Sequence, residues 1–408
     1  MSRKNIVTGV DIGTNKIVVL IGELNNSELK IIGVGKTKVN AVNSDGSITN
    51  LDELKNQLEL ACEEAEKMAD VQVDGFYVNL FGTNIKCFSS KSTINISDRD
   101  KGISGEDLVR VLENVKNTIV IPQGYEIIHI LARNFSVDEM TGIKDPVGMR
   151  GSRLEADVYV VTASNSIVDN IEKCVENAGF DIKDFVYEPL ASAESVLTSD
   201  EKKLGAMVVD IGSNYTGMAI YKNGSIVNSE IIPVGSNAIT NDLAIILRTS
   251  FEEAEKLKIR EGSLFALDNE TEKVELFNTS RESVRLVTRK HINEIIFARF
   301  EEIFKIIFDK CQENEHLELI KAGIVITGGG CQIEGLPVFV EHLFDVPCRI
   351  GKPLSLEGLF DKINSPVYST AAGILKYARK SHENTVVMEK SIIKKIMRKI
   401  KDYFETYF

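Results

Sequence analysis

Two short stretches decide the fold: Val10-Asp11-Ile12-Gly13-Thr14-Asn15 near the start, and Val209-Asp210-Ile211-Gly212-Ser213-Asn214 about half a chain later. Each stretch follows an apolar run and precedes a second β-rich run, residues 17–21 in the first case and 217–221 in the second. A strand, a tight glycine turn and another strand predict a β-hairpin. Because the pattern occurs twice, we expect two similar lobes, each built around a mixed sheet.

The composition is that of a globular protein with more than one domain. The chain has 408 residues, of which 43% are hydrophobic and 26% charged, and its formal net charge is −12. This acidic balance argues against nucleic acid as a partner, because phosphate contacts need basic surface. Asp11 interrupts the first apolar run, so we expect no signal peptide, and no apolar stretch reaches the roughly 18 residues of a membrane-spanning helix.

The spacing of apolar residues and glycines predicts the other main elements. We expect helices at 52–68, 105–117, 166–179, 250–260, 288–311 and 369–379, and strands at 76–88, 127–137, 154–162 and 322–327.

The two glycine turns have the chemistry of phosphate-binding loops. Glycine allows close approach of the backbone, so that neighbouring N–H groups and a Thr or Ser hydroxyl can point at phosphate oxygens. An aspartate repels phosphate but suits a hydrated Mg²⁺, which prefers to be held through water. We therefore predict a site for a triphosphate and Mg²⁺ between the lobes. Its residues are Asp11, Gly13, Thr14, Asn15 and Lys16 from the first turn, and Asp210, Gly212, Ser213 and Asn214 from the second, with the metal held through water by Asp11 and Asp210.

A third glycine-rich turn completes this pattern. The apolar strand expected at 322–327 runs directly into Gly328, Gly329 and Gly330. Three consecutive glycines let the backbone lie flat against a ribose or a base.

This constellation resembles the actin, Hsp70 and sugar-kinase superfamily, in which two phosphate turns and an adenosine turn follow one another in the same order. The resemblance implies a two-lobed, actin-like α/β fold (a duplicated ribonuclease H-like fold) that binds ATP and Mg²⁺. Residues 188–193 and 369–373 resemble the superfamily's two connecting helices. Their small side chains would let these helices cross closely at a hinge between the lobes.

The resemblance also implies roles for residues outside the turns. Glu255 and Lys258 match positions that contact ribose or adenine in bacterial actins; the alternative is a surface ion pair on one helix face. Glu188 matches the water-orienting position in catalysis, or it is simply a carboxylate at a helix N-terminus. Gly235 stands at the start of a turn that has two glycines in the family, but Ser236 follows it here.

Within the superfamily, residues 142–155 (GIKDPVGMRGSRLE) resemble the signature of the FtsA family of actin-like bacterial division proteins, and the resemblance extends from Asn5 to Phe408. In that family the signature lies in an inserted subdomain, 1C. The implied organisation is subdomain 1A at 1–83, 166–202 and 366–380, 1C at 84–165, 2A at 203–235 and 305–365, 2B at 236–304, a linker at 381–390 and an amphipathic helix at 391–408.

The function implied is that of an ATP-binding, polymerising scaffold with weak or no ATPase activity. Such a scaffold tethers the FtsZ ring to the inner face of the cytoplasmic membrane at the division site and helps to recruit other division proteins. In the family, subdomain 2B captures the acidic C-terminal peptide of FtsZ. Arg289 and Arg299, on a helix expected at 288–302, match this role, because arginine suits carboxylate capture. The alternative is a solvated helix face with Arg–Glu pairs.

The C-terminal residues 391–408, here called the tail, form an amphipathic pattern. At about 100° per residue, the apolar side chains fall within an arc of about 160°. The opposite face is mainly basic, which is typical of a helix lying in an anionic membrane surface. A helix packed on the core or in a coiled coil would show the same periodicity. The predicted membrane-binding residues are Ile392, Ile393, Ile396, Met397, Ile400 and Phe404 on the apolar face, and Lys394, Lys395, Arg398 and Lys399 on the basic face.

Two other functions fit the same fold: a soluble phosphotransferase, and a type IV pilus assembly protein resembling PilM. A kinase would need a catalytic aspartate beside a substrate cleft, and the sequence offers no motif for one. Neither alternative accounts for an amphipathic tail, so the sequence favours the division scaffold.

Overall fold

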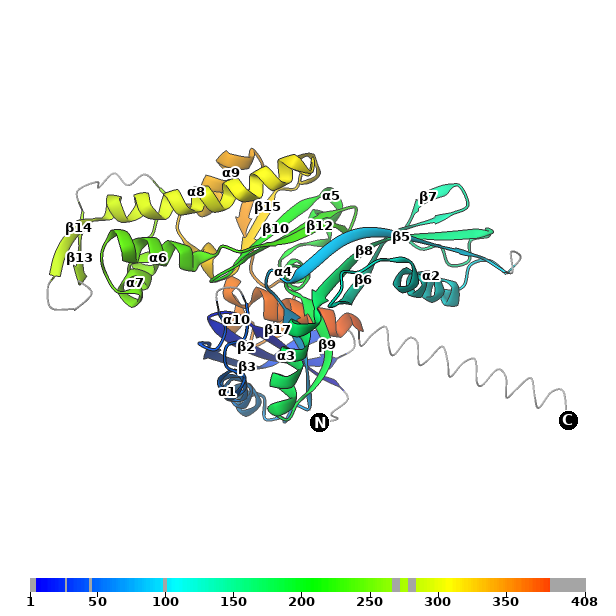
Figure 1. Cartoon of the computed structure of the whole chain (residues 1–408), viewed down its shortest axis with the longest axis horizontal. Helices are drawn as coiled ribbons and strands as arrows, with labels where there is room; N and C mark the ends of the chain where they lie inside the picture. The colour runs from blue at the N-terminus through cyan, green and yellow to red at the C-terminus, as the bar shows by residue number, and fades with distance from the viewer. Residues whose placement is uncertain are drawn as a thin grey trace.

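The computed structural model describes residues 5–25, 28–43, 46–97, 101–265, 272–277 and 284–381. Two α/β lobes lie against each other, with further subdomains at the two ends of an elongated molecule (Figure 1). The first lobe's sheet has the order β17 (Glu357–Gly358), β3 (Glu28–Lys38), β2 (Lys16–Asn25), β1 (Ile6–Ile12), β4 (Gly75–Leu80) and β9 (Asp181–Tyr187). The second lobe's sheet has the order β12 (Ser225–Ile232), β11 (Thr216–Lys222), β10 (Ala206–Ile211), β15 (Ile324–Thr327) and β16 (Cys348–Ile350).

The two sheets repeat one topology, as the sequence predicts. In each lobe the first strand pairs antiparallel with the next along the chain, β1 with β2 and β10 with β11. Its other edge pairs parallel, with β4 in the first lobe and β15 in the second. β1 and β10 are apolar almost throughout because both of their faces are covered. Both glycine turns therefore lie at equivalent sheet edges.

Helices cover the faces of both sheets. α1 (Leu51–Ala69) and α3 (Asn165–Asn177) belong to the first lobe, and α9 (Leu336–Phe344) and the long α8 (Arg289–Glu313) to the second. α1 lies very close to β3, since a Cβ added at Gly35 would fall 1.8 Å from the carbonyl oxygen of Ala61. Shorter elements are α5 (Ser199–Leu204), α10 (Phe360–Ile363), η2 (Leu317–Leu319), η3 (Gly329–Gln332) and η4 (Pro366–Tyr368).

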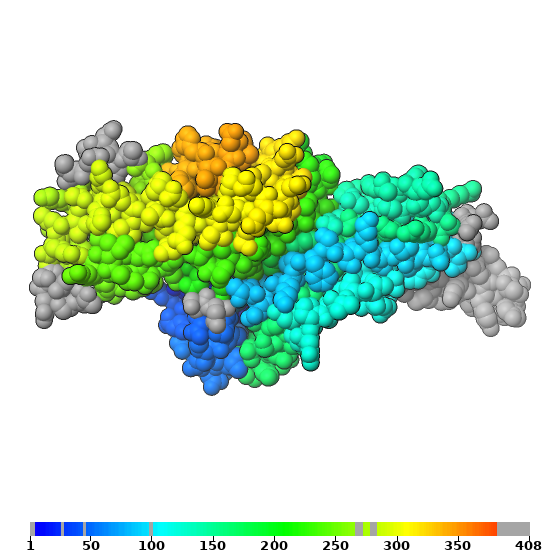
Figure 2. Space-filling model, turned by 45° about the horizontal axis from the view of Figure 1, so that its top comes forward, coloured from blue at the N-terminus to red at the C-terminus, as the bar shows by residue number. Residues whose placement is uncertain are grey.

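Each lobe carries a smaller unit at its outer end. A sheet of order β5 (Ile85–Asn95), β8 (Arg153–Ser164), β6 (Tyr125–Val137) and β7 (Met140–Ile143), with α2 (Gly105–Thr118), is inserted into the first lobe. The second lobe carries α6 (Ser236–Ile246), α7 (Phe251–Glu261) and the hairpin of β13 (Lys273–Phe277) and β14 (Val284–Thr288). Figure 2 shows these two units at opposite ends of the molecule, cyan and yellow-green respectively.

Most predicted elements are confirmed, but the single strand expected at 76–88 is wrong. β4 ends at Leu80 and β5 begins at Ile85 in a different sheet. Gly82, with φ +98°, lies in the connection that carries the chain from the first lobe into the inserted subdomain. Apolar residues recur at the end of β4, in the turn and at the start of β5, which made two strands look like one.

The predicted tail and residues 382–390 of the predicted linker lie outside the described residues, so that Ser381 alone of the linker is described. Within the part of the chain that is described, no helix combines the length and apolar character needed to cross a membrane.

The two lobes meet where α4 (Glu188–Val196) crosses the helix at 369–381. A Cβ added at Gly373 would lie 1.7 Å from the carbonyl oxygen of Ala191, so the helix backbones are almost in contact. The close crossing predicted from small side chains is confirmed.

We therefore expect Gly373→Ala to force the connecting helices apart. Overpacking of this kind costs about 1–3 kcal/mol and occasionally more, and here the obstacle is backbone, which cannot rotate away. The urea midpoint should fall accordingly. Gly105→Ala is the matched control, because a Cβ there meets nothing within 4 Å. Equal midpoints for the two variants would show that the crossing is not constrained.

Candidate functional site

The predicted turns converge on one cleft between the lobes. The residues lining this interlobe cleft are Asp11, Gly13, Thr14, Asn15, Lys16, Phe81, Glu188, Asp210, Gly212, Ser213, Tyr215, Gly328, Gly329, Pro366, Val367 and Thr370. Most of the predicted nucleotide residues, together with Glu188, are thus brought together from segments far apart in the chain. Asn214, Gly235, Glu255, Lys258 and Gly330 are not among the lining residues.

The first turn is closed by its own backbone and braced by a buried asparagine. The Gly13 N–H donates to the Lys16 carbonyl at 2.9 Å. Asn79, on β4 and fully buried, accepts from the Ile12 N–H at 2.7 Å and donates to Asp11 Oδ1 at 3.1 Å. Asn79 therefore fixes both the turn and its carboxylate. The sequence reasoning missed it, although a polar residue within an apolar strand was the available signal.

Lys16 supplies positive charge at this turn. Its Nζ lies 3.5 Å from Asp11 Oδ2 and also donates to the carbonyl of Val367. Lys16 thereby links the first turn to the segment that begins the last helix. Of the residues described as lining the interlobe cleft, it alone carries a positive charge.

The second turn repeats the first, and both connecting helices hold its carboxylate. The Gly212 N–H donates to the Tyr215 carbonyl at 2.9 Å. Asp210 Oδ2 accepts from Ser192 Oγ of α4 at 2.5 Å and from Thr370 Oγ1 of the last helix at 3.1 Å. The two connecting helices and the interlobe cleft are therefore joined at one oxygen. Neither hydroxyl residue was predicted, because a lone Ser or Thr in a helix gives no signal of its distant partner.

The triple glycine is required for two different reasons. Gly328 has φ +85°, and a Cβ there would lie 2.2 Å from Asp210 Oδ1. A Cβ at Gly330 would lie 2.6 Å from Ile211 Cγ2. Gly329 has nothing within 4 Å of its Cβ direction and lines the interlobe cleft. The outer two glycines pack against the second turn, and the middle one keeps the cleft open.

Gly235 and Asn214 are tied to the second turn without lining the cleft. At the start of α6, the N–H groups of Ser236 and Asn237 donate to the carbonyls of Gly212 and Ser213 at 2.9 and 2.7 Å. A Cβ at Gly235 would lie 2.6 Å from the Ser213 carbonyl oxygen, and Asn237 Nδ2 donates to Asn214 Oδ1 at 2.9 Å. Glycine is therefore required at 235 for packing against the second turn. Its contact with a nucleotide stays a prediction.

Glu255 and Lys258 form an ion pair, but not a surface one. Lys258 Nζ lies 2.7 Å from Glu255 Oε2, and the Lys258 side chain is 7% exposed. Lys258 also donates to Thr240 Oγ1 at 2.8 Å and to the Ser236 carbonyl at 3.2 Å. The pair joins α7 to α6 through Ser236 and Thr240. It therefore contacts the second turn only indirectly, through Ser236, whose N–H donates to the Gly212 carbonyl. Its role toward ribose or adenine stays a prediction.

Three carboxylates face the interlobe cleft and oppose each other's ionisation. Burial raises the pKa of Asp11, and the charge of Asp210 adds to the shift while Lys16 opposes it. Burial also raises the pKa of Asp210, against the hydrogen bonds from Ser192 and Thr370. The pKa of Glu188 lies well above its usual range because of burial and then the charges of Asp210 and Asp11. Such a site favours a bound cation.

No group of three His, Cys, Asp or Glu side chains among the described residues is arranged to hold a metal ion directly. Asp11 and Asp210 come from different lobes and face the same cleft. Coordination of Mg²⁺ through water by these two carboxylates stays a prediction.

Comparison with known proteins identifies the family. A family model described as cell division protein FtsA matches residues 207–373, and one for the SHS2 domain inserted in FtsA matches residues 82–162. The chain is 34% identical to cell division protein FtsA of Pseudomonas aeruginosa, over 95% of this chain and 92% of that protein. It is 33% identical to FtsA of Neisseria meningitidis, over 100% and 99% respectively. The chain belongs to the FtsA family of cell division proteins.

Solved structures confirm the actin-like fold expected for an FtsA protein. A chain of a PilM–PilN type IV pilus biogenesis complex superposes with a TM-score of 0.64 at 13% identity, covering 90% of this chain and 97% of that chain. MreB5 of Spiroplasma citri bound to ADP superposes with a TM-score of 0.56 at 16% identity, covering 93% and 98%. At these identities the likeness is one of fold.

The two arginines expected to bind FtsZ are already paired. Arg299 Nε and Nη2 donate to the Asp242 carboxylate at 2.6 and 2.9 Å, and Nη1 donates to Glu302 at 2.6 Å. Arg289 donates to Glu261 and, at 2.9 Å, to Glu272. The alternative of a helix face with ion pairs thus describes the chain alone, and an acidic peptide would have to replace some of these partners. Capture of FtsZ by these arginines stays a prediction.

The raised pKa of Glu188 predicts that this side chain lowers the free energy of unfolding of the FtsA protein at high pH but not at low pH. A carboxyl whose folded pKa lies above its unfolded value of about 4.5 stabilises the fold only below that value, and the contribution is lost as the pH rises through the folded pKa. Glu188→Gln should therefore unfold at higher urea than the natural protein at pH 8, with the difference disappearing towards pH 4. A difference that is independent of pH would contradict the raised pKa.

Proposed function

We propose that the protein is an ATP-binding, polymerising scaffold that tethers the FtsZ ring to the inner face of the cytoplasmic membrane. One observation carries the proposal: two equivalent Asp-Ile-Gly turns, one from each lobe, meet with the triple glycine at a single cleft rich in carboxylates. Family membership supports the division role. The solved MreB5 structure contains ADP, and a second one, with a TM-score of 0.52, contains AMPPNP.

The cleft residues fit ATP and Mg²⁺ in complementary roles. The turns at Gly13 and Gly212 offer backbone N–H groups and the hydroxyls of Thr14 and Ser213 to phosphate oxygens. Asp11 and Asp210 would hold the hydrated metal, which supplies the positive charge that these carboxylates lack. Gly329 leaves room for the base, and Lys258 with Glu255 supports α6 behind it. Glu188, at the cleft, would orient water in what we expect to be weak or no ATPase activity.

Gly329→Leu should block nucleotide binding without unfolding the protein. The Cβ direction of Gly329 is open, so a large side chain projects into space and not into the core. We expect the affinity for ATP measured by calorimetry with Mg²⁺ to fall more than about tenfold, or about 1.4 kcal/mol. Gly105→Leu, which adds the same side chain at an open position on α2, is the control. Undiminished affinity of the Gly329 variant would refute the placement of the base.

The tail supplies the proposed membrane contact. Its basic face carries five Lys or Arg residues against Asp402 and Glu405, in a protein of net charge −12. Each basic residue near an anionic leaflet is worth about 1 kcal/mol, and insertion of the Ile and Phe side chains adds the hydrophobic contribution. A helix of this type lies in the membrane surface, so the protein would be peripheral and would need no spanning segment.

Ile396→Glu combined with Phe404→Glu should abolish co-flotation with anionic liposomes and leave ATP binding intact. Both changes place a charge on the apolar face. The matched control is Ser391→Glu with Thr406→Glu, which adds the same charge on the polar face and should still float. Equal flotation of the apolar-face variant and the natural protein would refute the tether.

Self-association and FtsZ binding would use the two ends of the molecule. The signature at 142–155 comprises the last two residues of β7, a loop and the start of β8 in the inserted subdomain (Figure 1), and none of its residues lines the interlobe cleft. Asp138 braces this loop by accepting from the N–H groups of Ser152 and Arg153, each at 3.0 Å. An ordered loop that contributes no residue to the interlobe cleft supports the proposal that the inserted subdomain contacts a neighbouring protomer. The opposite end, with α8, would take the FtsZ peptide.

Arg299→Glu should weaken binding of the acidic FtsZ C-terminal peptide at least about tenfold, since a hydrogen bond to a charged group is worth about 1.5–3 kcal/mol. Lys305→Glu is the control, because Lys305 is exposed on the same helix. Circular dichroism must show that both variants are folded, since the change also removes the contacts to Asp242. Equal peptide affinity of the two variants would reject this site.

The fold similarity to PilM does not by itself favour a role in pilus assembly. The identity to that chain is 13%, against 34% to FtsA of Pseudomonas aeruginosa over nearly the whole chain. Likewise, the carboxylates of the interlobe cleft lie beside the phosphate turns, and no observation on the described residues favours a phosphotransferase.

A further inference from the structure

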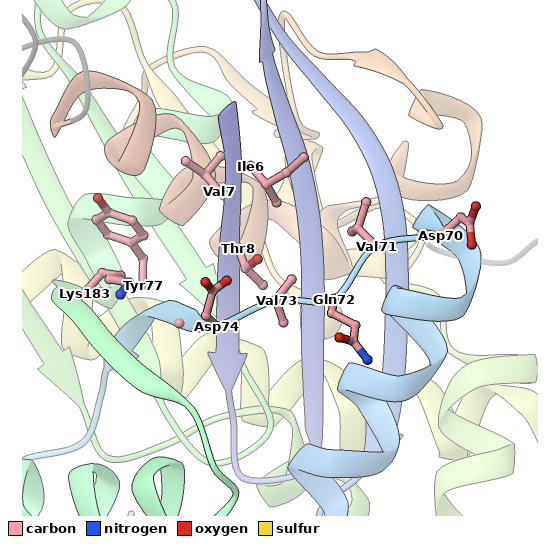
Figure 3. A pocket seen from close by; sticks show the side chains of 11 residues that line it. Ile6, Val7, Thr8, Asp70, Val71, Gln72, Val73, Asp74, Tyr77 and Lys183 are labelled. Atoms are coloured by element: carbon pink, nitrogen blue, oxygen red, sulfur yellow. The ribbon is translucent and has the colours of Figure 1, made fainter. Parts of the chain in front are cut away.

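A cavity of about 560 Å³ lies at the opposite end of β1 from the first glycine turn. β1 pairs with β4 only at Gly9–Tyr77 and Val10–Val78, so the start of β1 is paired with β2 on one edge and has no strand on the edge that faces β4. Figure 3 shows Ile6, Val7 and Val73 around this basal cavity, with the loop at 70–74 closing one side. The interlobe cleft uses none of these residues.

The described chain ends at the rim of the basal cavity. Tyr77, which lines the cavity, packs edge-on against Tyr377 of the last helix, with ring centroids 6.4 Å apart. The Tyr77 hydroxyl also hydrogen-bonds the side chain of Ser381, the last described residue. Residues 382–390 then separate this point from the tail and can span about 30 Å when extended. The tail therefore begins well within reach of the cavity.

The rim complements the tail in charge and polarity. Asp70 and Asp74 line the basal cavity, with Lys183 as the opposing charge (Figure 3). A second hollow shares Asp70, Val71 and Gln72 with it and adds Glu63, Glu66 and Lys67. The combined surface thus contains apolar side chains, among them Ile6, Val7 and Val73, and its charged residues are mainly acidic. The tail has an apolar face bordered by basic residues, which is the matching arrangement.

We propose that the basal cavity is a docking site for the tail of the same chain when no membrane is present. The proposal rests on the proposed role of the tail in membrane binding and adds a competing partner for it. The same Ile and Phe side chains cannot contact the cavity and the lipid together, so docking lowers the apparent lipid affinity by the fraction of chains in which the tail is bound. An anionic membrane surface releases the tail.

Photo-crosslinking in the full chain tests docking directly. Gln72 is exposed at the rim, so Gln72→p-benzoylphenylalanine should leave the fold intact. Irradiation without lipid should produce an intramolecular crosslink to residues 391–408, identified by mass spectrometry. Vesicles of phosphatidylcholine and phosphatidylglycerol should abolish it. Val120→p-benzoylphenylalanine, at a side chain 94% exposed on the inserted subdomain, should give no such crosslink. Absence of the tail crosslink at 72, or a crosslink only between two copies of the chain, would overturn the proposal.

Flotation with the same vesicles tests the competition. Gln72→Lys with Asp74→Lys reverses the charge of the rim at two exposed residues. It should lower the lipid concentration for half-maximal flotation at least threefold, because the released tail is free to bind. Gln123→Lys with Glu139→Lys adds the same charge at exposed positions of the inserted subdomain and should have a smaller effect. Equal shifts for the two pairs would overturn docking. If the natural protein does not float at all, the tether is refuted, and the crosslink at 72 still decides whether the tail docks.

Discussion

The structure depends on three carboxyl groups that lie close together between the two lobes. Asp11 and Asp210 lie at equivalent strand ends of the two sheets, and Glu188 begins the helix that connects them. All three line one cleft with Lys16, and burial raises the pKa of each. Such a cleft is unfavourable when empty and becomes favourable when a cation neutralises it. The cleft is therefore suited to a ligand that brings positive charge, as the proposed ATP with Mg²⁺ would.

One of these carboxylates also connects the cleft to the crossing of the two connecting helices. Asp210 accepts hydrogen bonds from one hydroxyl on each connecting helix, and those helices cross with Gly373 against Ala191. A change in charge at Asp210 thus acts on the crossing of the two connecting helices. The inserted subdomain is also tied to both lobes. His129 accepts from the Tyr187 N–H at 3.0 Å, and the Tyr159 hydroxyl accepts from the Ser229 N–H at 2.8 Å. A filament contact at that subdomain would therefore be sensitive to the arrangement of the lobes.

The sequence predicted what depends on local pattern. A repeated Asp-Ile-Gly turn after an apolar strand specifies a hairpin and a close approach of backbone, and both lobes have them. Asn79 was visible as a polar residue within an apolar strand, but its partner Asp11 was not. Ser192 and Thr370 gave no signal, because each acts on a carboxylate more than a dozen residues away that only the fold brings near. The prediction of one strand at 76–88 was wrong because the local pattern of apolar residues continues although the chain passes from one sheet to another. Burial of Lys258 likewise follows from the packing of α6 on α7 and not from its spacing to Glu255.

Thermal unfolding of the intact protein with ATP, compared in Mg²⁺ and in EDTA, tests the central claim most directly. A ligand at 100 times its Kd stabilises the folded state by about 2.7 kcal/mol. If the cation neutralises Asp11, Asp210 and Glu188, ATP with Mg²⁺ should raise the midpoint by several degrees, and more at pH 8 than at pH 5, whereas ATP in EDTA should have little effect. Equal stabilisation with and without Mg²⁺, or none in either case, would contradict the account.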